Sequence, residues 1–371
     1  MDRFIVTYRV AAADAGEARA RALDLALEQT VEIPGDIVPA GYIAETIVGR
    51  IEELRSAGPD AFLIDVSFSD ATIGNDFLQF LNVVFGNSSL KSGLRVEGVQ
   101  PSAAISALCP GPKFGRAGLR QMTGIASGPL LLSAIKPMGL STAELADLAY
   151  RFALGGMDLV KDDHGLTNQT SAPYADRLEA CVAAIARANR ETGGTTRFIA
   201  NITGPADQIR ARADMAQRLG AGGVMLAPAL LGYDVTRTLA ADPTFMLPIF
   251  SHPSFGGANV IASGIGFSHG FYFGQLQRLL GIDAVIYPNF GGRFGFSEAE
   301  CSEIVAQCDL PYAGLPAIFP CPGGGMTLER IPGMRRVYGE DVIYLMGGAL
   351  LRHRDDLPGA CRALAHAVGR A

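Results

Sequence analysis

The chain lacks tryptophan and is poor in charge. Only 18% of its 371 residues are charged, while 49% are hydrophobic; an average soluble domain has about 25% charged residues. This composition excludes a disordered chain and predicts a large core, or surface removed from water by subunit contacts. The net charge of −6 leaves no basic footprint for nucleic acid or an anionic membrane, so we expect neither as a partner.

Several motifs are also missing. The six cysteines include no CxxC pair, which favours reduced core thiols in a cytoplasmic protein. No GxSxG or HExxH motif occurs, so hydrolase triads and zincin chemistry have no support. Residues 243–277 contain no charge, but prolines and glycines interrupt the run. We interpret it as a buried strand, a glycine-rich loop and the start of a helix, not a membrane span.

The first 110 residues mix strands and helices in a βαββαβ-like order. The expected elements are residues 4–10, 13–28, 40–48, 61–67, 75–85 and 94–99. This order predicts an N-terminal α+β domain, residues 1–110, of the ferredoxin-like type. Residues 100–112 are the expected linker.

From residue 111 to residue 371, short apolar runs alternate with amphipathic helices. The runs are 130–135, 157–161, 197–202, 222–226, 245–250, 284–287, 313–319 and 342–346. The helices between them include 141–154, 173–190, 205–219, 271–280 and 298–308. Eight such units predict an α/β fold of the (β/α)8 TIM-barrel type. A doubly wound sheet is the alternative, but it would need a switch point that the pattern does not show.

Active sites of such barrels lie at the C-terminal ends of the strands. The polar residues and glycines expected there are Lys136, Lys161 to His164, Asn201, His252, Arg293, Gly324, Gly325, Gly347 and Gly348. Glycine lets a backbone approach an anion closely, so the two glycine pairs predict a phosphate site. Ordinary loop glycines are the alternative.

The segment Lys161-Asp162-Asp163-His164 carries the most specific signal. Asp163 and His164 can both coordinate a metal ion. Lys161 ends a buried strand, where a bare ammonium is costly, and carbamylation would convert it into an oxygen ligand. The alternative is a solvated turn with a local ion pair. Lys136 could act as a general acid or an electrostatic catalyst, or lie on the surface.

In this order, the motifs resemble the large subunit of ribulose-1,5-bisphosphate carboxylase (RuBisCO) and, more closely, the RuBisCO-like proteins of form IV. The matching segments are 135–137 with 139–141, 155–158 with 161–163, 191–193, Asn201, 323–326 with Pro332, 347–348, Glu28, and 74–75 with 84–86. The resemblance covers nearly the whole chain. It implies a homodimer, or a higher oligomer of dimers, in which Glu28 and Asn75 of one chain complete the partner's barrel site.

The resemblance also implies roles for the barrel residues. Lys161 matches the lysine that CO2 carbamylates and that binds Mg²⁺ together with Asp163. Lys136 matches the lysine that moves protons to and from an enediolate, and the glycine pairs match the surroundings of one phosphate. His164 stands where the family has glutamate. Replacing glutamate with a neutral imidazole takes away one negative charge and one hard oxygen ligand. We therefore expect the affinity for Mn²⁺ or Zn²⁺ to rise relative to the affinity for Mg²⁺.

Departures from the family pattern concern the second phosphate of a bisphosphate. Pro253 follows His252 where the family has arginine, and Tyr287 takes the place of a strand-6 histidine. Arg293 is at best a substitute for the mobile lysine of the following loop. A second phosphate would therefore lack its cations, and we do not expect carboxylation of a bisphosphate.

Three functions follow from this resemblance. The first is a decarboxylase or C–C hydrolase that forms a metal-stabilised enediolate from a 3-oxo sugar-acid monophosphate, of the 3-oxo-isoapionate 4-phosphate type, with Arg293 clamping the carboxylate. The second is an enolase or isomerase of a methylthio-pentulose-type monophosphate in sulfur salvage. The third is a catalytically silent scaffold or ligand-binding protein. Retention of Lys136, Lys161 and Asp163 favours an enzyme.

Overall fold

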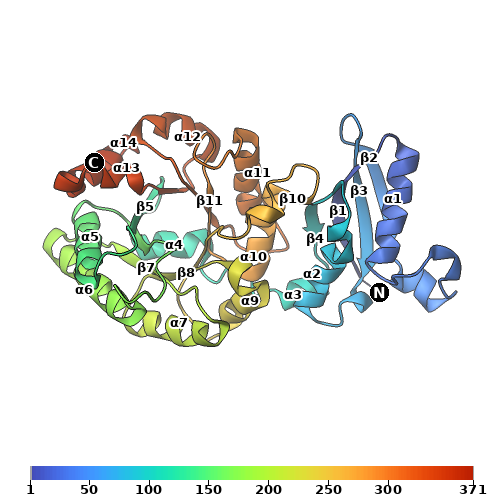
Figure 1. The fold of residues 1–371 in the computed structure, drawn as a ribbon, viewed down its shortest axis with the longest axis horizontal. Coiled ribbons are helices and arrows are strands. Elements are labelled where there is room, and N and C mark those ends of the chain that lie inside the picture. The colour runs from blue at the N-terminus through green and yellow to red at the C-terminus, as the bar shows by residue number, and fades with distance from the viewer. Residues whose placement is uncertain (1, 371) are drawn as a thin grey trace.

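The computed structural model describes residues 2–370, which form two sheets with helices around them (Figure 1). A five-stranded mixed sheet belongs to the N-terminal domain, and eight parallel strands close into a barrel. The predicted fold class, an α+β domain followed by a (β/α)8 barrel, is confirmed. The domain boundary after residue 110 stays a prediction.

The N-terminal domain has the predicted βαββαβ order. Its elements are β1 (Arg3–Ala11), α1 (Ala15–Glu28), β2 (Arg50–Ser56), β3 (Ala61–Ser69), α2 (Phe77–Phe85) and β4 (Leu94–Gln100). The four strands are antiparallel in the order β4-β1-β3-β2. Along β1 every second residue is buried, so one face of the sheet packs on the helices and the other is less covered.

The second strand does not lie where the sequence predicts it. The expected element at 40–48 is wrong, because Ile43–Ile47 forms a π-helical turn with no buried residue. The strand is β2, an edge strand whose side chains are mostly exposed. Backbone hydrogen bonds to β3 hold this strand in the sheet. Because its side chains are mostly polar, the hydrophobic pattern of the sequence does not reveal it.

The barrel strands all run in parallel, and the ring closes where β9 pairs with β11. The strands are β5 (Leu130–Ile135), β6 (Leu159–Asp162), β7 (Arg197–Asn201), β8 (Gly223–Leu226), β9 (Ile249–Ser251), β11 (Ala284–Pro288), β12 (Phe319–Gly323) and β13 (Ile343–Leu345). The main helices outside it are α5 (Thr142–Leu154), α6 (Tyr174–Thr192), α7 (Ile209–Arg218), α9 (Tyr233–Ala241), α10 (Leu276–Leu280), α11 (Glu298–Asp309), α12 (Ile331–Tyr338) and α14 (Leu357–Ala367).

The seventh barrel strand is displaced from its expected position. The prediction of 313–319 is wrong except for its last residue, because β12 begins at Phe319. Tyr312 and Leu315 instead bridge a turn. Pro320 and Pro322 lie inside this strand. Because proline has no backbone N–H to donate to a neighbouring strand, their presence argues against a strand when only the sequence is known.

A short strand links the barrel to the N-terminal sheet. β10 (Gly266–Phe267) comes from the loop after β9 and pairs in parallel with β4. Beside it, the Ser268 N–H donates to the Val96 carbonyl at 2.8 Å. The uncharged run 243–277 thus contains β9, this strand and a buried helical turn. No helix within residues 2–370 combines the length and apolarity needed to cross a membrane.

Alternation along the barrel strands determines which side chains enter the lumen. Leu130, Leu132 and Leu159 belong to the inner hydrophobic cluster. Because side chains alternate across a strand, Lys136 and Lys161 continue the same inward series at the C-terminal end. At the C-terminal end of the barrel, the amines of Lys136 and Lys161 therefore lie directly above the apolar inner layer.

Candidate active site

Two neighbouring strands bring their polar ends together at the barrel mouth. Ile135 of β5 lies opposite Asp162 of β6 in the register, so the residues that follow each are also neighbours. Lys136 Nζ lies 3.1 Å from Asp163 Oδ1. The predicted meeting of these side chains at one rim is present in the structure, and their roles stay a prediction.

Lys161 is a buried amine. Its side chain is enclosed, with 1% exposure, and Nζ donates to the Asp162 carbonyl oxygen at 2.9 Å. Burial lowers the pKa of Lys161 to about 8; Asp163 opposes this shift and Lys136 adds to it. A lysine with this pKa has an appreciable neutral fraction near pH 7, so it can accept a proton or attack CO2.

Asp163 stays ionised although it is largely enclosed. Burial alone would raise its pKa, but the adjacent His164 side chain and the charges of Lys161 and Lys136 hold the pKa well below its usual range. His164 Nδ1 lies 3.7 Å from Asp163 Oδ1, and half of the His164 side chain is exposed. The site therefore has a permanent negative charge between two amines and an imidazole.

His252 also reaches the mouth, from the residue after β9. Its ring stacks on that of His164, with centroids 4.3 Å apart and planes 11° apart. His252 Nδ1 contacts Ser254 Oγ at 2.7 Å. Burial, together with the nearby Lys161 and His164, lowers the pKa of His252 well below its usual value. His252 is therefore neutral, with Nε2 left for a ligand.

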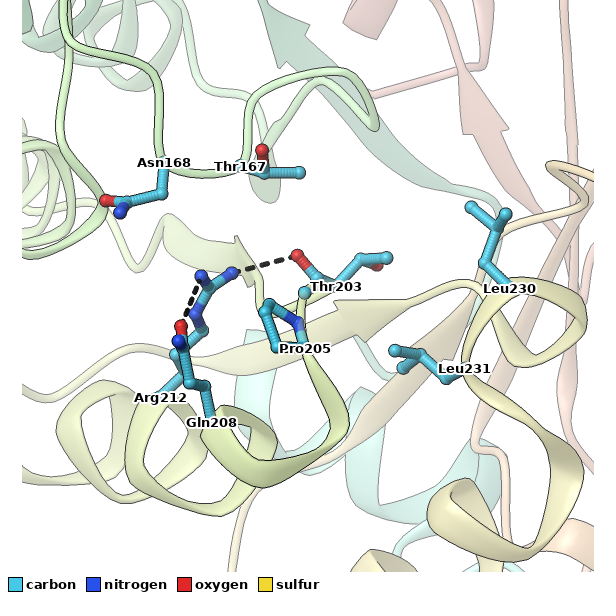
Figure 2. Close-up of a pocket in the computed structure, with 9 residues that line it drawn as sticks. Thr167, Asn168, Thr203, Pro205, Gln208, Arg212, Leu230 and Leu231 are labelled. Carbon is cyan, nitrogen blue, oxygen red and sulfur yellow. Dashed lines mark hydrogen bonds between the residues drawn. The ribbon is translucent and has the colours of Figure 1, made fainter.

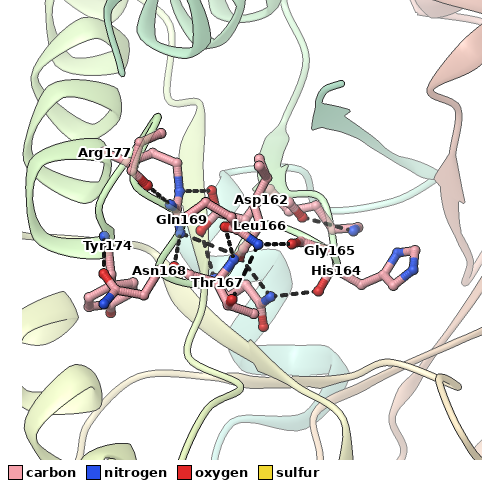
Figure 3. Close-up of polar contacts among 12 residues, drawn as sticks. Asp162, His164, Gly165, Leu166, Thr167, Asn168, Gln169, Tyr174 and Arg177 are labelled. Carbon is pink, nitrogen blue, oxygen red and sulfur yellow. Dashed lines mark hydrogen bonds and ion pairs between the residues drawn. The ribbon is translucent and has the colours of Figure 1, made fainter. Parts of the chain in front are cut away.

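A buried arginine holds the loop that carries Asp163 and His164 (Figure 3). The Arg177 guanidinium of α6 is fully enclosed; its Nε donates to Asp162 Oδ1 at 2.9 Å and its Nη atoms donate to carbonyls of Ala172, Leu166 and Thr167. Sequence reasoning missed this residue. The available signal was its place on the apolar face of α6, next to Leu178.

Asn201 fastens the other side of the same loop. Its backbone N–H donates to Asp162 Oδ2 at 2.9 Å, and its Nδ2 donates to the carbonyls of His164 and Leu166, both at 2.9 Å. Asn201 is fully buried. It touches the loop backbone and not the two amines, so it acts on the site by positioning.

The donor set fits a metal ion only if Lys161 is carbamylated. Within residues 2–370, no three His, Cys, Asp or Glu side chains form a cluster that could hold a metal. Asp163 and His164 supply two donors beside the buried Lys161 amine. A carbamate there would add an oxygen donor and remove one positive charge, which completes a three-ligand set.

The two glycine pairs follow the neighbouring strands β12 and β13, and β13 lies beside β5. Gly324 and Gly325 have φ values of 86° and 87°, which favour glycine. A Cβ on Gly325 would lie 3.1 Å from Gly292 Cα, so the loops after β11 and β12 touch. A Cβ on Gly347 would lie 3.4 Å from Lys136 Cε, which places this glycine beside the catalytic candidate. Gly348 follows it and begins a short helix.

The expected role of Arg293 stays a prediction, whereas the structure corrects the position assigned to Tyr287. Arg293 is exposed and its guanidinium covers the Phe294 ring at 5.1 Å, with no ion pair to any residue between 2 and 370. The interpretation of Tyr287 is wrong: its ring packs outside the barrel beside Phe273 and Tyr338. The inward residue is Ile286, because a shift of one residue changes the face of a strand. Ile286, like Tyr287, carries no charge, so this strand supplies no cation for a second phosphate.

Glu28 and Asn75 lie in the N-terminal domain, where Figure 1 shows α1 on the side remote from the barrel. Glu28 ends α1 and accepts a hydrogen bond from Asn87 Nδ2 at 3.1 Å. Asn75 lies in the turn before α2 with a φ of 59°. Neither residue lies at the mouth of its own barrel. That they complete the site of a partner chain stays a prediction.

Comparisons with known proteins agree with this geometry. A family model described as the ribulose bisphosphate carboxylase large chain, catalytic domain, matches residues 116–369. The chain is 40% identical over 371 residues to a 5-methylthioribulose-1-phosphate isomerase from Rhodospirillum rubrum, covering 100% of this chain and 97% of the relative. A 2,3-diketo-5-methylthiopentyl-1-phosphate enolase from Bacillus licheniformis is 31% identical over 318 residues, 85% of this chain and 78% of the enolase.

Solved structures point to the same family. A RuBisCO-like protein from Rhodopseudomonas palustris superposes with a TM-score of 0.88 at 35% identity, covering 100% of this chain and 99% of the other. A dimeric archaeal RuBisCO from Hyperthermus butylicus has a TM-score of 0.87 at 26% identity, covering 99% and 90%. The chain belongs to the RuBisCO large-chain family and, within it, to the RuBisCO-like enzymes of form IV.

Proposed function

We propose that this chain is an isomerase of the enolising type that acts on a pentulose monophosphate carrying a methylthio group. The observation that carries the proposal is the junction of Lys136, Lys161 and Asp163 at the rim of the barrel. The relatives named as a methylthioribulose-phosphate isomerase and a diketo-methylthiopentyl-phosphate enolase support the substrate class.

The reaction needs a proton to leave the carbon beside a ketone and return elsewhere through an enediolate. Lys136 Nζ is the proposed carrier of this proton, because it ends in the mouth beside Gly347 and is oriented by Asp163. His252 Nε2 is the proposed hydrogen-bonding partner for a substrate hydroxyl. Backbone N–H groups of the loops at Gly324, Gly325, Gly347 and Gly348 are the proposed phosphate site.

The proposed metal ligands are carbamylated Lys161, Asp163 and His164. When bound there, Mg²⁺, or Mn²⁺ or Zn²⁺ because of the imidazole, would polarise the ketone and stabilise the charge of the enediolate. Arg177 and Asn201 hold the loop that presents Asp163 and His164, so the ligands are placed before substrate arrives.

An isomerase accounts for the surroundings of the mouth better than a decarboxylase of a sugar-acid phosphate. The decarboxylase expectation needs a cation to clamp the substrate carboxylate. Arg293 lies on Phe294 at the surface, and Ile286 is the inward residue of the neighbouring strand. One proposed phosphate site, together with the apolar side chain of Ile286 in the mouth, suits a monophosphate whose other end is uncharged.

The proposed assembly is a homodimer whose sites lie at the subunit boundary, and the proposed location is the cytoplasm. The dimer is supported by the relative from Hyperthermus butylicus, which is described as dimeric. Glu28 and Asn75 of one chain would complete the partner's site.

The test is incubation of the purified protein with 5-methylthioribulose 1-phosphate in D2O. We expect an isomeric pentulose phosphate by ³¹P NMR and deuterium at carbon by ¹H NMR, without CO2. 2,3-Diketo-5-methylthiopentyl 1-phosphate in a parallel reaction separates enolase from isomerase. Release of CO2 from a 3-oxo sugar-acid phosphate, with no reaction of the methylthio substrates, would overturn the proposal.

A further inference from the structure

Arginine side chains hold several of the loops that follow the barrel strands. Arg177 holds the loop after β6, as described above. Arg212 of α7 lines a pocket of about 400 Å³ and donates there to the Thr203 carbonyl, in the loop after β7 (Figure 2). Each of these guanidinium groups joins a helix outside the barrel to a loop. A third arginine, Arg330, joins the two loops at the proposed phosphate site.

Arg330 bridges two successive carbonyl groups of the loop after β11. It is half-buried and ends a short turn, Leu328–Arg330, in the segment between β12 and α12. Its Nη1 donates to the Gly291 carbonyl and its Nη2 to the Phe290 carbonyl, both at 2.8 Å. The guanidinium also lies over the Phe290 ring, 5.5 Å from the ring centre. A Cβ on Gly291 would collide with Nη2, so this contact needs glycine there.

The same loop packs on the glycines of the proposed phosphate site. The Asn289 N–H donates to the Gly323 carbonyl at 2.8 Å, which continues the pairing of the two loops past the end of β11. Further along, a Cβ on Gly292 would collide with the Gly324 carbonyl oxygen, and one on Gly325 would lie 3.1 Å from Gly292 Cα. The backbones of the two loops are therefore in direct contact behind the glycine pair.

This contact matters because glycine backbone is costly to order. Backbone N–H groups of glycines bind an anion well only if other groups already hold them in place. The loop after β11 supports Gly324 and Gly325 but contains three glycines itself, at 291, 292 and 295. A guanidinium can hold two carbonyls at once, since its N–H donors form a rigid planar fork. Arg330 thus fixes the loop that supports the glycines of its own segment.

We propose that Arg330 is a positioning residue of the phosphate site, which acts by bridging the carbonyls of Phe290 and Gly291. The inference rests on the phosphate site of the proposed function and adds the residue that orders it. The contacts of Arg330 within residues 2–370 include no carboxylate. Direct attraction of the phosphate by its charge is therefore the competing explanation, and the two explanations differ in what a lysine at this position would do.

The test is titration of the purified protein with inorganic phosphate by isothermal titration calorimetry. Arg330→Met removes the charge and both hydrogen bonds, whereas Arg330→Lys keeps the charge and loses the fork. We expect the dissociation constant for phosphate to rise at least roughly tenfold in both variants. Arg336→Met is the matched control, because it removes the same charge from an exposed position of α12 and should leave the constant near wild type.

Two further measurements separate positioning from a general loss of structure. Hydrogen exchange followed by mass spectrometry should become faster in residues 289–296 of both Arg330 variants and stay unchanged in residues 159–166. With the methylthio substrate, KM should rise by the same factor as the phosphate constant, while kcat changes less. Thermal unfolding reports whether each variant folds.

Phosphate affinity near wild type in either Arg330 variant would overturn the inference, and retention in Arg330→Lys alone would assign the effect to charge. An equal loss of affinity in Arg336→Met would overturn it as well. A wild-type chain that binds no phosphate would overturn the phosphate site itself. The expected phosphate constants without turnover of a methylthio substrate would overturn only the proposed reaction.

Discussion

At the scale of single residues, the choice between lysine and arginine is informative. The chain has 31 basic residues, of which only Lys91, Lys113, Lys136 and Lys161 are lysines. Arginine stays protonated in proteins, whereas a lysine amine can lose its proton when buried. Two of the four lysines meet at the barrel mouth, where the proposed reaction needs an amine that exchanges protons or reacts with CO2.

Lys136→Met should remove the proton carrier and leave the fold intact, because the side chain is partly exposed. We expect turnover and deuterium exchange to fall by roughly 10² to 10⁴. Lys113→Met is the matched control; this lysine donates to the carbonyls of Asp242 and Phe245, before β9, and its loss should leave the rate near wild type. Equal rates in the two variants would contradict the role of Lys136.

Carbamylation of Lys161 should depend on pH around 8, the lowered pKa of its amine. Below this pH the amine is protonated and cannot attack CO2; above it the neutral amine dominates. Between pH 7 and pH 9 the neutral fraction rises roughly tenfold. With ¹³CO2, the carbamate signal in ¹³C NMR should be weak at pH 7, strong at pH 9 and absent in Lys161→Ala. A pH-independent signal would be inconsistent with this pKa.

At the scale of elements, α6 supports the site through a single guanidinium. Arg177→Met would leave Asp162 as an unpaired buried charge and release three loop carbonyls, so we expect a loss of roughly 3–5 kcal/mol of stability. Chemical denaturation measures this loss. Arg187→Met, on the exposed face of the same helix, is the control and should cost far less. Similar losses in both variants would show that the network does not stabilise the loop.

Elements were predictable where pattern and packing agree. The capping box at Ser141 and Glu144 starts α5 as the sequence predicts. Strands β2 and β12 were misplaced, because one is a polar edge strand and the other contains Pro320 and Pro322. The family resemblance placed Tyr287 at the strand-6 histidine, one residue late, because the apolar run of β11 has no alternation that would have shown Ile286 to be the inward residue.

At the scale of the whole molecule, the proposed sites at the subunit boundary predict complementation between inactive chains. Glu28→Gln and Lys161→Ala should each abolish turnover as homodimers. After unfolding and co-refolding in equal amounts, half of the dimers are mixed and one site in each is intact, so about a quarter of wild-type activity should return. Absence of recovery, with mixed dimers demonstrated by mass spectrometry, would show that each site is built from one chain.

The whole-molecule architecture was predictable because eight apolar runs with helices between them suit a closed barrel. The meeting of Lys136 with Asp163 followed from the rule that strand ends share one rim. The network at Arg177 could not be predicted, because it joins a helix side chain to carbonyls of a loop, and the sequence does not show that these segments meet. The two-residue strand β10 is likewise too short for any periodic signal.

That small strand has a mechanical consequence. Residues 253–265 form a tether that starts at His252, on the rim of the cylinder, and ends in a sheet belonging to the other half of the molecule. This segment is a direct connection along the chain between His252 and the N-terminal sheet. Removal of the N-terminal domain would therefore take away the strand with which β10 pairs and leave the loop after His252 without its anchor.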